Sequence, residues 1–389
     1  MVKAGGTALC LSGGGYRAAL FHLGAMLRLH ERDELPEIGL FSAVSGGSIA
    51  LAWLASRYLA LREDESEDFD EWCGRCDFRA QVLEPFRAVA ARDLRSFAVM
   101  ATAPLNWLWP TPRVRLLERG YRRFLGGLTL GELPEAPNFV FCATDLGFGC
   151  NWEFSRRRVG DFQAGYLREP GAVSLATAVA ASSSFPPLFG PVRLPARALD
   201  FSGGKQSGSE LLDRIELSDG GVYDNMAMEP ALKRCARILV SDAGAPFGFQ
   251  AGRHYFRRLL RYAAVIGNQA VALRKRLFYC RREAGDFTGA YWHLGEERDA
   301  GADGYSLGLC RDLLARVRTD LDRFTAAEFE VLVNHGYFSC DDGLHAGHLG
   351  EVDAPALAWP YPEWQSEEKV SAALRQSHRR LRRPRWWQN

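Results

Sequence analysis

The stretch Phe41-Ser42-Ala43-Val44-Ser45-Gly46-Gly47-Ser48 ends an apolar run on a serine among small residues and continues into a second apolar segment. A serine at such a strand-to-helix turn must take a strained backbone conformation, and small residues at Ala43 and Gly47 permit it. A helix that begins directly after the serine turns unpaired N–H groups and the positive end of its dipole toward the hydroxyl. The stretch therefore predicts Ser45 as a nucleophile, although a plain glycine-rich turn would have the same residues.

A glycine loop precedes this stretch. Residues 7–11 form a candidate strand, Ser12-Gly13-Gly14-Gly15 follows, and residues 16–31 carry apolar side chains at helical spacing. Such a unit is an anion site, because glycine lets the amides approach a bound group and the helix N-terminus is positive.

Two functions fit this loop. As an oxyanion hole, the amides of Gly14 and Gly15 would face the tetrahedral intermediate that the serine forms, and Arg17 would brace the loop or attract an anionic head group. As a dinucleotide site, Gly13-x-Gly15-x-x-Ala18 and Asp33 would imitate the fingerprint that binds a pyrophosphate and a ribose. Asp33, however, falls in a charged stretch at the end of the helix and not at the tip of a second strand.

An acidic turn lies further along the chain. Residues 214–217 are a candidate strand, and Ser218-Asp219-Gly220-Gly221 follows it. A carboxylate at the tip of a strand, ahead of two glycines that permit a tight turn, sits where α/β enzymes place catalytic groups. Asp219 is therefore the candidate base, with Asp224 as the second choice. The simpler interpretation is an Asp-Gly turn in which Asn225 caps a helix that begins at Met226.

These motifs contain no histidine base. A serine nucleophile of the triad type needs a histidine nearby, but none of the 8 histidines stands in a comparable motif. Aspartate titrates near ~3.9 and is a weak base at neutral pH, so the oxyanion hole and the helix dipole must carry more of the barrier. A Ser45–Asp219 dyad requires that arrangement.

Two groups of possible metal ligands have simpler explanations. Cys73 and Cys76 have the spacing of a metal or redox pair, but no second pair accompanies them. His345 and His348, with Asp341, Asp342 and Cys340 nearby, are explained equally well by a polar loop. We expect neither a metal nor another cofactor.

Composition restricts the class of protein. The chain has 389 residues, a formal net charge of +1 and 24% charged residues, which suits a large α/β domain with additions and does not indicate a nucleic-acid partner. Nine cysteines without regular spacing favour a reduced, cytoplasmic protein. The sequence has neither a signal-peptide pattern nor a run of about 18 apolar residues, which predicts a soluble or peripheral protein.

The two β-α units fix the start of a parallel sheet, with a second strand expected over residues 37–44 and a helix over 48–61. Further strands are expected over residues 138–144, 151–154 and 237–240. Further helices are expected over residues 113–124, 173–181, 255–282, 325–337 and 365–381.

Three motifs, taken in order, resemble the patatin-like phospholipase family: Gly13-Gly14-Gly15-Tyr16-Arg17, Val44-Ser45-Gly46-Gly47 and Asp219-Gly220-Gly221. Residues 181–189 and Asp224-Asn225 are similar to that family as well. The resemblance implies an α/β fold, a three-layer α/β/α sandwich with a mainly parallel central sheet. It implies Ser45 as nucleophile, Asp219 as base and the amides of the glycine loop as oxyanion hole. The loop residues are Gly13, Gly14 and Gly15, and the supporting residues are Arg17, Gly47, Gly220 and Gly221. Ala43 and Ala18 stand where the family usually has glycine, and both replacements are small.

The resemblance also implies a division of the chain and an activity. An acyl hydrolase domain would cover residues 7–245, with 59–135 as a candidate insertion or lid, and a mainly helical extension over 246–389 would pack on the same domain. The implied reaction is hydrolysis of acyl esters in phospholipids or other lipids. Transfer of the acyl group to another alcohol would use the same residues, and an inactive relative that binds lipid or a partner is the alternative from a different class. Peripheral membrane contact is a separate hypothesis, based on Trp107–Trp109 and on the basic, aromatic residues 379–387.

Overall fold

The structure is a computed structural model that describes residues 5–96, 111–186, 188–194, 200–207, 209–248, 255–295, 303–349 and 355–379. Its strands are β1 (Thr7–Leu11), β2 (Ile38–Ala43), β3 (Asn138–Asp145), β4 (Cys150–Phe154), β5 (Val159–Asp161), β6 (Gly165–Leu167), β7 (Phe201–Ser202), β8 (Leu217–Asp219), β9 (Arg237–Asp242) and β10 (Thr288–His293). Its α-helices are α1 (Gly15–Glu31), α2 (Gly46–Leu61), α3 (Phe69–Arg75), α4 (Glu84–Ala90), α6 (Thr111–Leu125), α7 (Leu175–Ser182), α8 (Gly221–Asp224), α9 (Glu229–Arg234), α10 (Tyr255–Glu283), α11 (Leu307–Asp312), α12 (Ala326–Ala346) and α13 (Glu367–Leu374).

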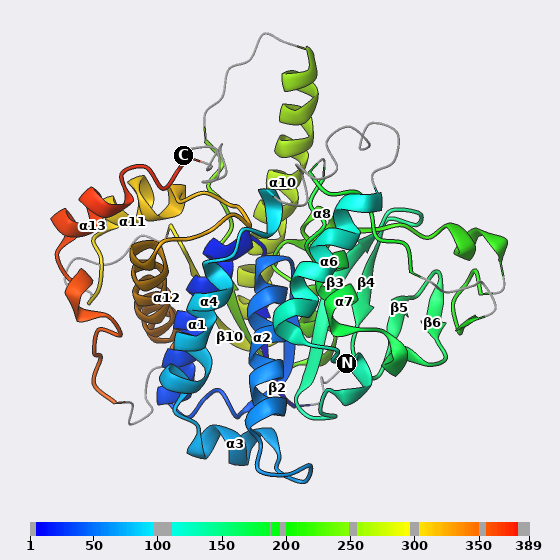
Figure 1. Cartoon of the computed structure of the whole chain (residues 1–389), viewed down its shortest axis with the longest axis horizontal. Helices are drawn as coiled ribbons and strands as arrows, with labels where there is room; N and C mark the ends of the chain where they lie inside the picture. Colours follow the sequence, from blue (N-terminus) through cyan, green and yellow to red (C-terminus); the bar gives the residue numbers. More distant parts are fainter. Residues whose placement is uncertain are drawn as a thin grey trace.

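A single ten-stranded sheet runs through the molecule in the order β10-β9-β1-β2-β3-β4-β5-β6-β7, with β8 also paired to β3. The strands from β10 to β3 are parallel, whereas β4 to β7 and β8 pair antiparallel. Helices lie in front of and behind this sheet (Figure 1). The three-layer α/β/α sandwich with a mainly parallel centre, expected from the sequence, is confirmed.

The central strands are buried on both faces, which explains why they read as continuous apolar runs. Leu9 and Leu11 of β1 belong to a core shared with α1, α2, α7 and α12. Ala8 and Cys10 of the same strand belong to a second, smaller core with α9 and with Phe278 of α10. Since successive strand side chains point to opposite faces, the two cores are the two sides of one sheet.

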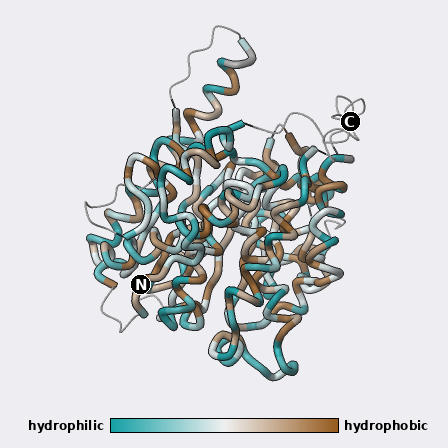
Figure 2. Tube along the Cα trace, turned by 60° about the vertical axis from the view of Figure 1, so that its left-hand side comes forward, coloured by the Kyte–Doolittle hydropathy of each residue, from teal (hydrophilic) through white to brown (hydrophobic). Residues whose placement is uncertain are grey.

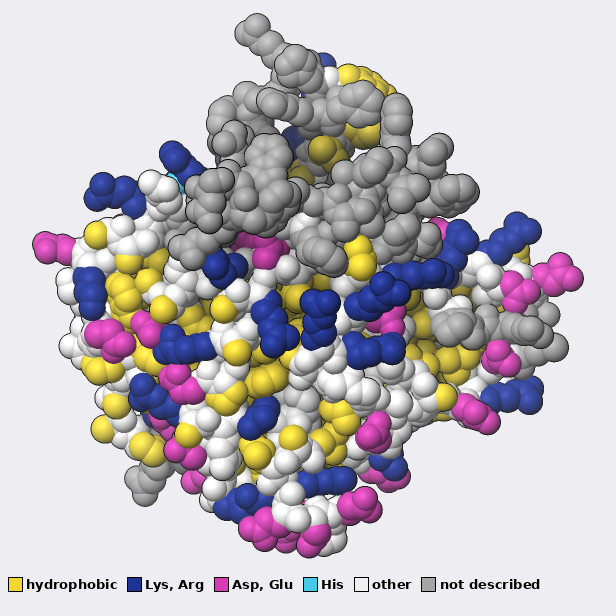
Figure 3. All heavy atoms as spheres, in the orientation of Figure 1, with side chains coloured by type: hydrophobic (Ala, Val, Ile, Leu, Met, Phe, Trp, Pro, Cys, Tyr) yellow, Lys and Arg dark blue, Asp and Glu magenta, His cyan; other side chains and the backbone are white. Residues whose placement is uncertain are grey.

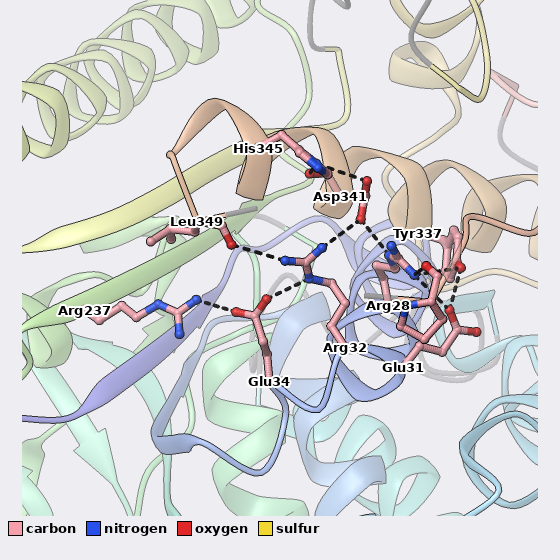
Figure 4. Close-up of polar contacts among 10 residues, drawn as sticks. Arg28, Glu31, Arg32, Glu34, Arg237, Tyr337, Asp341, His345 and Leu349 are labelled. Carbon is pink, nitrogen blue, oxygen red and sulfur yellow. Dashed lines mark hydrogen bonds and ion pairs between the residues drawn. The ribbon is translucent and has the colours of Figure 1, made fainter. Parts of the chain in front are cut away.

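Helix α12 packs along α1 and carries a buried charge cluster at the end of α1 (Figure 4). Asp341 accepts hydrogen bonds from Arg28 Nε at 2.7 Å and from Arg32 Nη1 at 3.3 Å, and its Oδ2 lies 3.2 Å from His345 Nδ1. The polar loop expected for Cys340, Asp341, Asp342, His345 and His348 is wrong for the first four residues, because α12 continues to Ala346, and only His348 lies beyond the helix. Asp341 is neutralised by arginines, and within the described residues no group of His, Cys, Asp and Glu is arranged to hold a metal ion.

Three further local expectations need correction. The strand expected over residues 214–217 is displaced: residues 210–214 form a 3-10 turn, and β8 starts at Leu217. Asn225 does not cap a helix from Met226, since α8 ends at Asp224 and α9 begins only at Glu229. The C-terminal residues also contribute strand β10, which lies parallel to β9 and was not expected from the sequence.

Residues 97–110, which include the Trp107–Trp109 segment, and residues 380–389 of the tail lie outside the described residues. Among the helices that are described, none is long and apolar enough to cross a membrane.

Candidate functional site

Ser45 occupies the turn between β2 and α2 in the strained conformation that its sequence predicts. Its φ of 53° and ψ of −116° lie in the region that favours glycine, and it is the residue directly before the first turn of α2. Gly47 is required on the other side of the turn, because a Cβ there would lie 2.4 Å from the Leu11 carbonyl oxygen. Ala43 is an ordinary strand residue paired with Leu11 and Phe141 and does not have a positive φ, so this position does not require glycine.

Helix α7 holds the turn from the other side through Ser182. The Ser45 amide donates to Ser182 Oγ at 3.0 Å, and Ser182 Oγ donates to the Cys142 carbonyl oxygen at 2.7 Å. The Gly220 amide donates to the carbonyl oxygen of the same Ser182 at 3.3 Å. Ser182, which lies in the segment 181–189 that resembles the family but to which no role could be assigned from the sequence, thus connects the turns that carry Ser45 and Asp219.

The glycine loop packs directly against the serine turn. A Cβ on Gly13 would lie 3.2 Å from Ser45 Cβ, and a Cβ on Gly46 would lie 2.2 Å from the Gly15 carbonyl oxygen. Gly14 and Gly15 have φ of +150° and +62°. The amide of Gly13 donates to the Asn225 carbonyl oxygen at 3.0 Å. Of the three expected oxyanion donors, Gly13 is therefore already engaged, and Gly14 and Gly15 are the candidates.

A strap from the C-terminal part of the chain, residues 315–321, holds the glycine loop in place. Tyr16 N donates to the Asp320 carbonyl oxygen at 3.0 Å, and a Cβ on Gly15 would lie 2.4 Å from that oxygen. Arg17, which is 1% exposed, donates to the carbonyl oxygens of Val317 at 2.8 Å and Ala315 at 3.3 Å, and also to that of Ala243. Burial lowers the pKa of Arg17 to about 10. Its guanidinium braces the loop and does not face a head group.

Asp219 ends β8 and is 2% exposed. Its Oδ1 accepts the Gly221 amide at 2.7 Å. Burial raises the pKa of Asp219 to about 7, and hydrogen bonds from Gly221 and from the Ser45 hydroxyl reduce that rise. Oδ2 nevertheless makes no well-aligned hydrogen bond, so serine and carboxyl group are adjacent without being locked together, as is common before substrate binds.

Asp224 has a structural task. Its carboxylate accepts the amides of Met226, Met228 and Glu229 at 2.8 to 3.1 Å, and Arg274 Nη1 lies 3.4 Å from its Oδ2. These contacts leave Asp219 as the base candidate. The side chain of the next residue, Asn225, lies against the site, since Cβ atoms on Gly13 and Gly221 would come within 2.5 and 2.6 Å of its Oδ1.

His22 is a neutral side chain that hydrogen-bonds to the backbone at the start of the glycine loop. Its Nε2 donates to the Ser12 carbonyl oxygen at 2.9 Å, which leaves Nδ1 to accept from Ser241 Oγ at 2.8 Å. Burial lowers the pKa of His22 to about 4. The dinucleotide interpretation has no support, because Asp33 follows the far end of a 17-residue helix, roughly 25 Å from the glycine loop.

A cavity of about 640 Å³ lies elsewhere, between α6, β6 and the first turn of α7. Its lining includes Glu118, Arg168 and Thr177 but neither Ser45 nor Asp219. The cavity is therefore separate from the serine site.

The family model of patatin-like phospholipases matches residues 9–232, more than half of the chain. This protein belongs to the patatin-like phospholipase family, and membership supports lipid hydrolase activity. The matched span contains the glycine loop, Ser45 and Asp219, but not the strap.

The fold is also similar to solved structures. VipD from Legionella pneumophila matches at 15% identity and a TM-score of 0.37, over 96% of this chain and 74% of that protein. Human GIVD cytosolic phospholipase A2, solved with a fluorophosphonate inhibitor, matches at 16% identity and a TM-score of 0.49, over 96% of this chain and 60% of that protein. A search of curated protein sequences finds no match.

Proposed function

We propose that this protein is a serine acyl hydrolase that cleaves acyl esters of phospholipids or related lipids. The observation that carries the proposal is the position of a strained serine at the start of α2 beside a buried carboxyl group whose pKa is raised to about 7. A carboxylate with a pKa near the working pH is a far better general base than a free aspartate.

The geometry supports the following sequence. Asp219 accepts the proton of the Ser45 hydroxyl while Oγ forms a bond to the ester carbonyl carbon, and the amides of Gly14 and Gly15 stabilise the oxyanion. The intermediate collapses, the proton passes from Asp219 to the departing alcohol, and the acyl group remains on Oγ. Water then attacks the acyl-enzyme, Asp219 takes its proton, and the fatty acid leaves as Ser45 recovers its hydrogen.

The lipid substrate class follows from family membership, and a substrate held in a bilayer requires peripheral membrane contact. The charge of +1 over 389 residues offers no general attraction to nucleic acid. We therefore keep phospholipid as the proposed substrate and a membrane surface as the proposed partner.

Labelling with a fluorophosphonate ester tests the proposal. We expect the wild-type protein to react at Ser45, as located by peptide mass spectrometry, and to release fatty acid from mixed phospholipid vesicles. Ser45→Ala is the control and should do neither. A folded wild-type protein that neither labels nor releases fatty acid would contradict the proposal.

Gly15→Ala tests the glycine loop. The new Cβ would lie 2.4 Å from the Asp320 carbonyl oxygen, so the loop must shift, and we expect hydrolysis to fall about 100-fold. Gly126→Ala is the matched control, because Gly126 has nearly the same φ, +69° against +62°, but its Cβ would meet nothing within 4 Å. Both variants should lose about 1 kcal/mol of stability from φ alone. Equal activity of the two variants would remove this loop from the catalytic site.

A further inference from the structure

Helix α10 carries an exposed apolar stripe on one face. The stripe consists of Tyr255, Leu259, Tyr262, Ile266, Leu273 and Leu277, whose side chains are 42% to 77% exposed. Their spacing of three, four or seven residues places them along one side of an α-helix. Val271 and Phe278, toward the other side, pack on the smaller core instead. From Leu259 to Leu277 the stripe is thus a second apolar face that is largely exposed.

The N-terminal half of α10 stands clear of the body of the molecule, and both views agree on this (Figures 1 and 2). In this half even residues outside the stripe, such as Leu260, are exposed. The C-terminal half is anchored: Arg274 contacts Asp224 at 3.4 Å and donates to the Tyr223 carbonyl oxygen at 3.3 Å. The anchor is α8, the helix that follows Asp219 and Gly220.

The stripe projects from the end of the molecule at which the site lies. In Figure 1, α3, which follows α2, lies at the lower end, so the N-terminal end of α2 is directed toward the upper part of the molecule, from which α10 projects. Ser45 is the residue directly before α2. On the face shown in Figure 3, Lys and Arg side chains gather in a band across the middle of the molecule. Leu273 and Leu277 of the stripe lie on either side of Arg274 in the sequence, and the contacts of Arg274 with α8 place this part of α10 beside the turn that carries Asp219.

The charge of α10 indicates which kind of surface the stripe would contact. Residues 255–283 contain eight arginines or lysines and a single acidic residue, Glu283. A second copy of the helix is disfavoured, because Arg258 and Arg276 flank the stripe, and two-stranded coiled coils normally place opposite charges there. An apolar face bordered by arginines, with tyrosines on it, suits an interface of anionic lipid. We propose that α10 docks on anionic phospholipid membranes through this stripe and so brings Ser45 to the lipid surface.

The proposal rests on the proposed lipid hydrolase function but can be tested without hydrolysis. Full-length Ser45→Ala protein is mixed with vesicles of phosphatidylcholine alone or with added phosphatidylglycerol, and bound protein is measured by co-sedimentation. We expect binding only to the anionic vesicles. Changing Leu259, Ile266 and Leu273 to Gln should weaken that binding at least about tenfold, because the apolar contribution is removed.

A matched control uses apolar residues of similar exposure on other elements. Leu211→Gln with Phe162→Gln removes side chains that are 58% and 52% exposed, and binding should not change. Both variants should keep the wild-type melting temperature, since none of the replaced side chains is buried. Equal vesicle binding by the stripe variant would overturn the proposal. A second result would also overturn it. If the wild type is a dimer, the stripe variant is a monomer and both bind vesicles equally, the stripe is covered by a second copy of the chain and not by lipid.

Two readouts separate this proposal from the proposed function. An environment-sensitive fluorophore on Ile266→Cys, in a Cys280→Ser background, should shift to shorter wavelength with anionic vesicles; the other eight cysteines are buried. Fluorophosphonate labelling of Ser45 in vesicle-free solution should be the same in the stripe variant and in the wild type. If neither protein is labelled but vesicle binding still depends on the stripe, the proposed hydrolase function is overturned and the proposed docking surface is supported.

Discussion

Ser45→Ala and Ser45→Gly are both expected to lower hydrolysis of a soluble ester by roughly 10⁴-fold or more, because removal of a nucleophile abolishes the covalent route. The two variants should differ in stability. At φ 53° and ψ −116° an alanine keeps the strain that Ser45 bears, whereas glycine accepts this conformation freely. We expect Ser45→Gly to be more stable than Ser45→Ala by about 1 kcal/mol, as measured by denaturant unfolding.

The comparison also controls for folding. If only Ser45→Ala lost activity, its lower stability could explain the loss. An equal loss of activity in the more stable Ser45→Gly cannot be explained by unfolding. Hydrolysis retained in Ser45→Gly would exclude Ser45 as the nucleophile.

Asp219→Asn is expected to reduce kcat by roughly 10³-fold or more while raising stability. Only the carboxylate can take the serine proton, so wild-type kcat/KM should rise with pH up to about 7 and then level off. The residual kcat/KM of Asp219→Asn should not show this rise with pH. Because the pKa of the folded state exceeds the usual 3.8, the folded protein holds this proton more tightly than the unfolded chain does. The stabilisation from that proton is complete below pH about 4 and is lost as pH rises through about 7.

Above that pH the wild type keeps a buried carboxylate that the variant replaces with a neutral amide. The difference between the folded-state and the usual pKa of this carboxyl group corresponds to about 4 kcal/mol of stability. This is the upper limit of the increase in unfolding free energy expected for Asp219→Asn at pH 8. Thermal unfolding at pH 5 and pH 8 measures it, with Asp224→Asn as the control. Asp224 binds three backbone amides and Arg274, so its replacement should destabilise the protein. An Asp219→Asn variant with wild-type kcat would exclude this residue as the base.

The parts of the site that lie in one short stretch could be predicted from the sequence. The turn around Ser45 has to satisfy a local steric requirement, and small residues on either side reveal it. The same holds for the glycine loop and for Asp219 ahead of Gly220 and Gly221. In each case the signal is a backbone constraint within a few residues. The structure shows the strands and helices predicted on either side of the glycine loop and of Ser45, whereas the strand before Asp219 begins only at Leu217.

The parts that depend on distant segments could not be predicted. Ser182 lies in a segment that resembles the family, but its role could not be assigned, because its contacts with the Ser45 amide and Cys142 require the packed fold. Asp320 contributes a backbone carbonyl oxygen, which any residue type provides, so the sequence holds no sign of it. Strand β10 lies between helices in a region without a recognised motif. The same limit explains why Asp341 was assigned to a loop: its partners, Arg28 and Arg32, are about 310 positions away in the sequence.

The contact between Asp320 and the glycine loop orders events during synthesis of the chain. Ser45 and Asp219 leave the ribosome long before residue 320, yet the glycine loop gains the contacts of Tyr16 and Arg17 with the strap only after residues 315–321 have been made. A nascent chain that ends with the family-matching span, at residue 232, thus lacks these contacts to the glycine loop. We therefore expect a fragment of residues 1–232 to hold its glycine loop less rigidly than the full chain does.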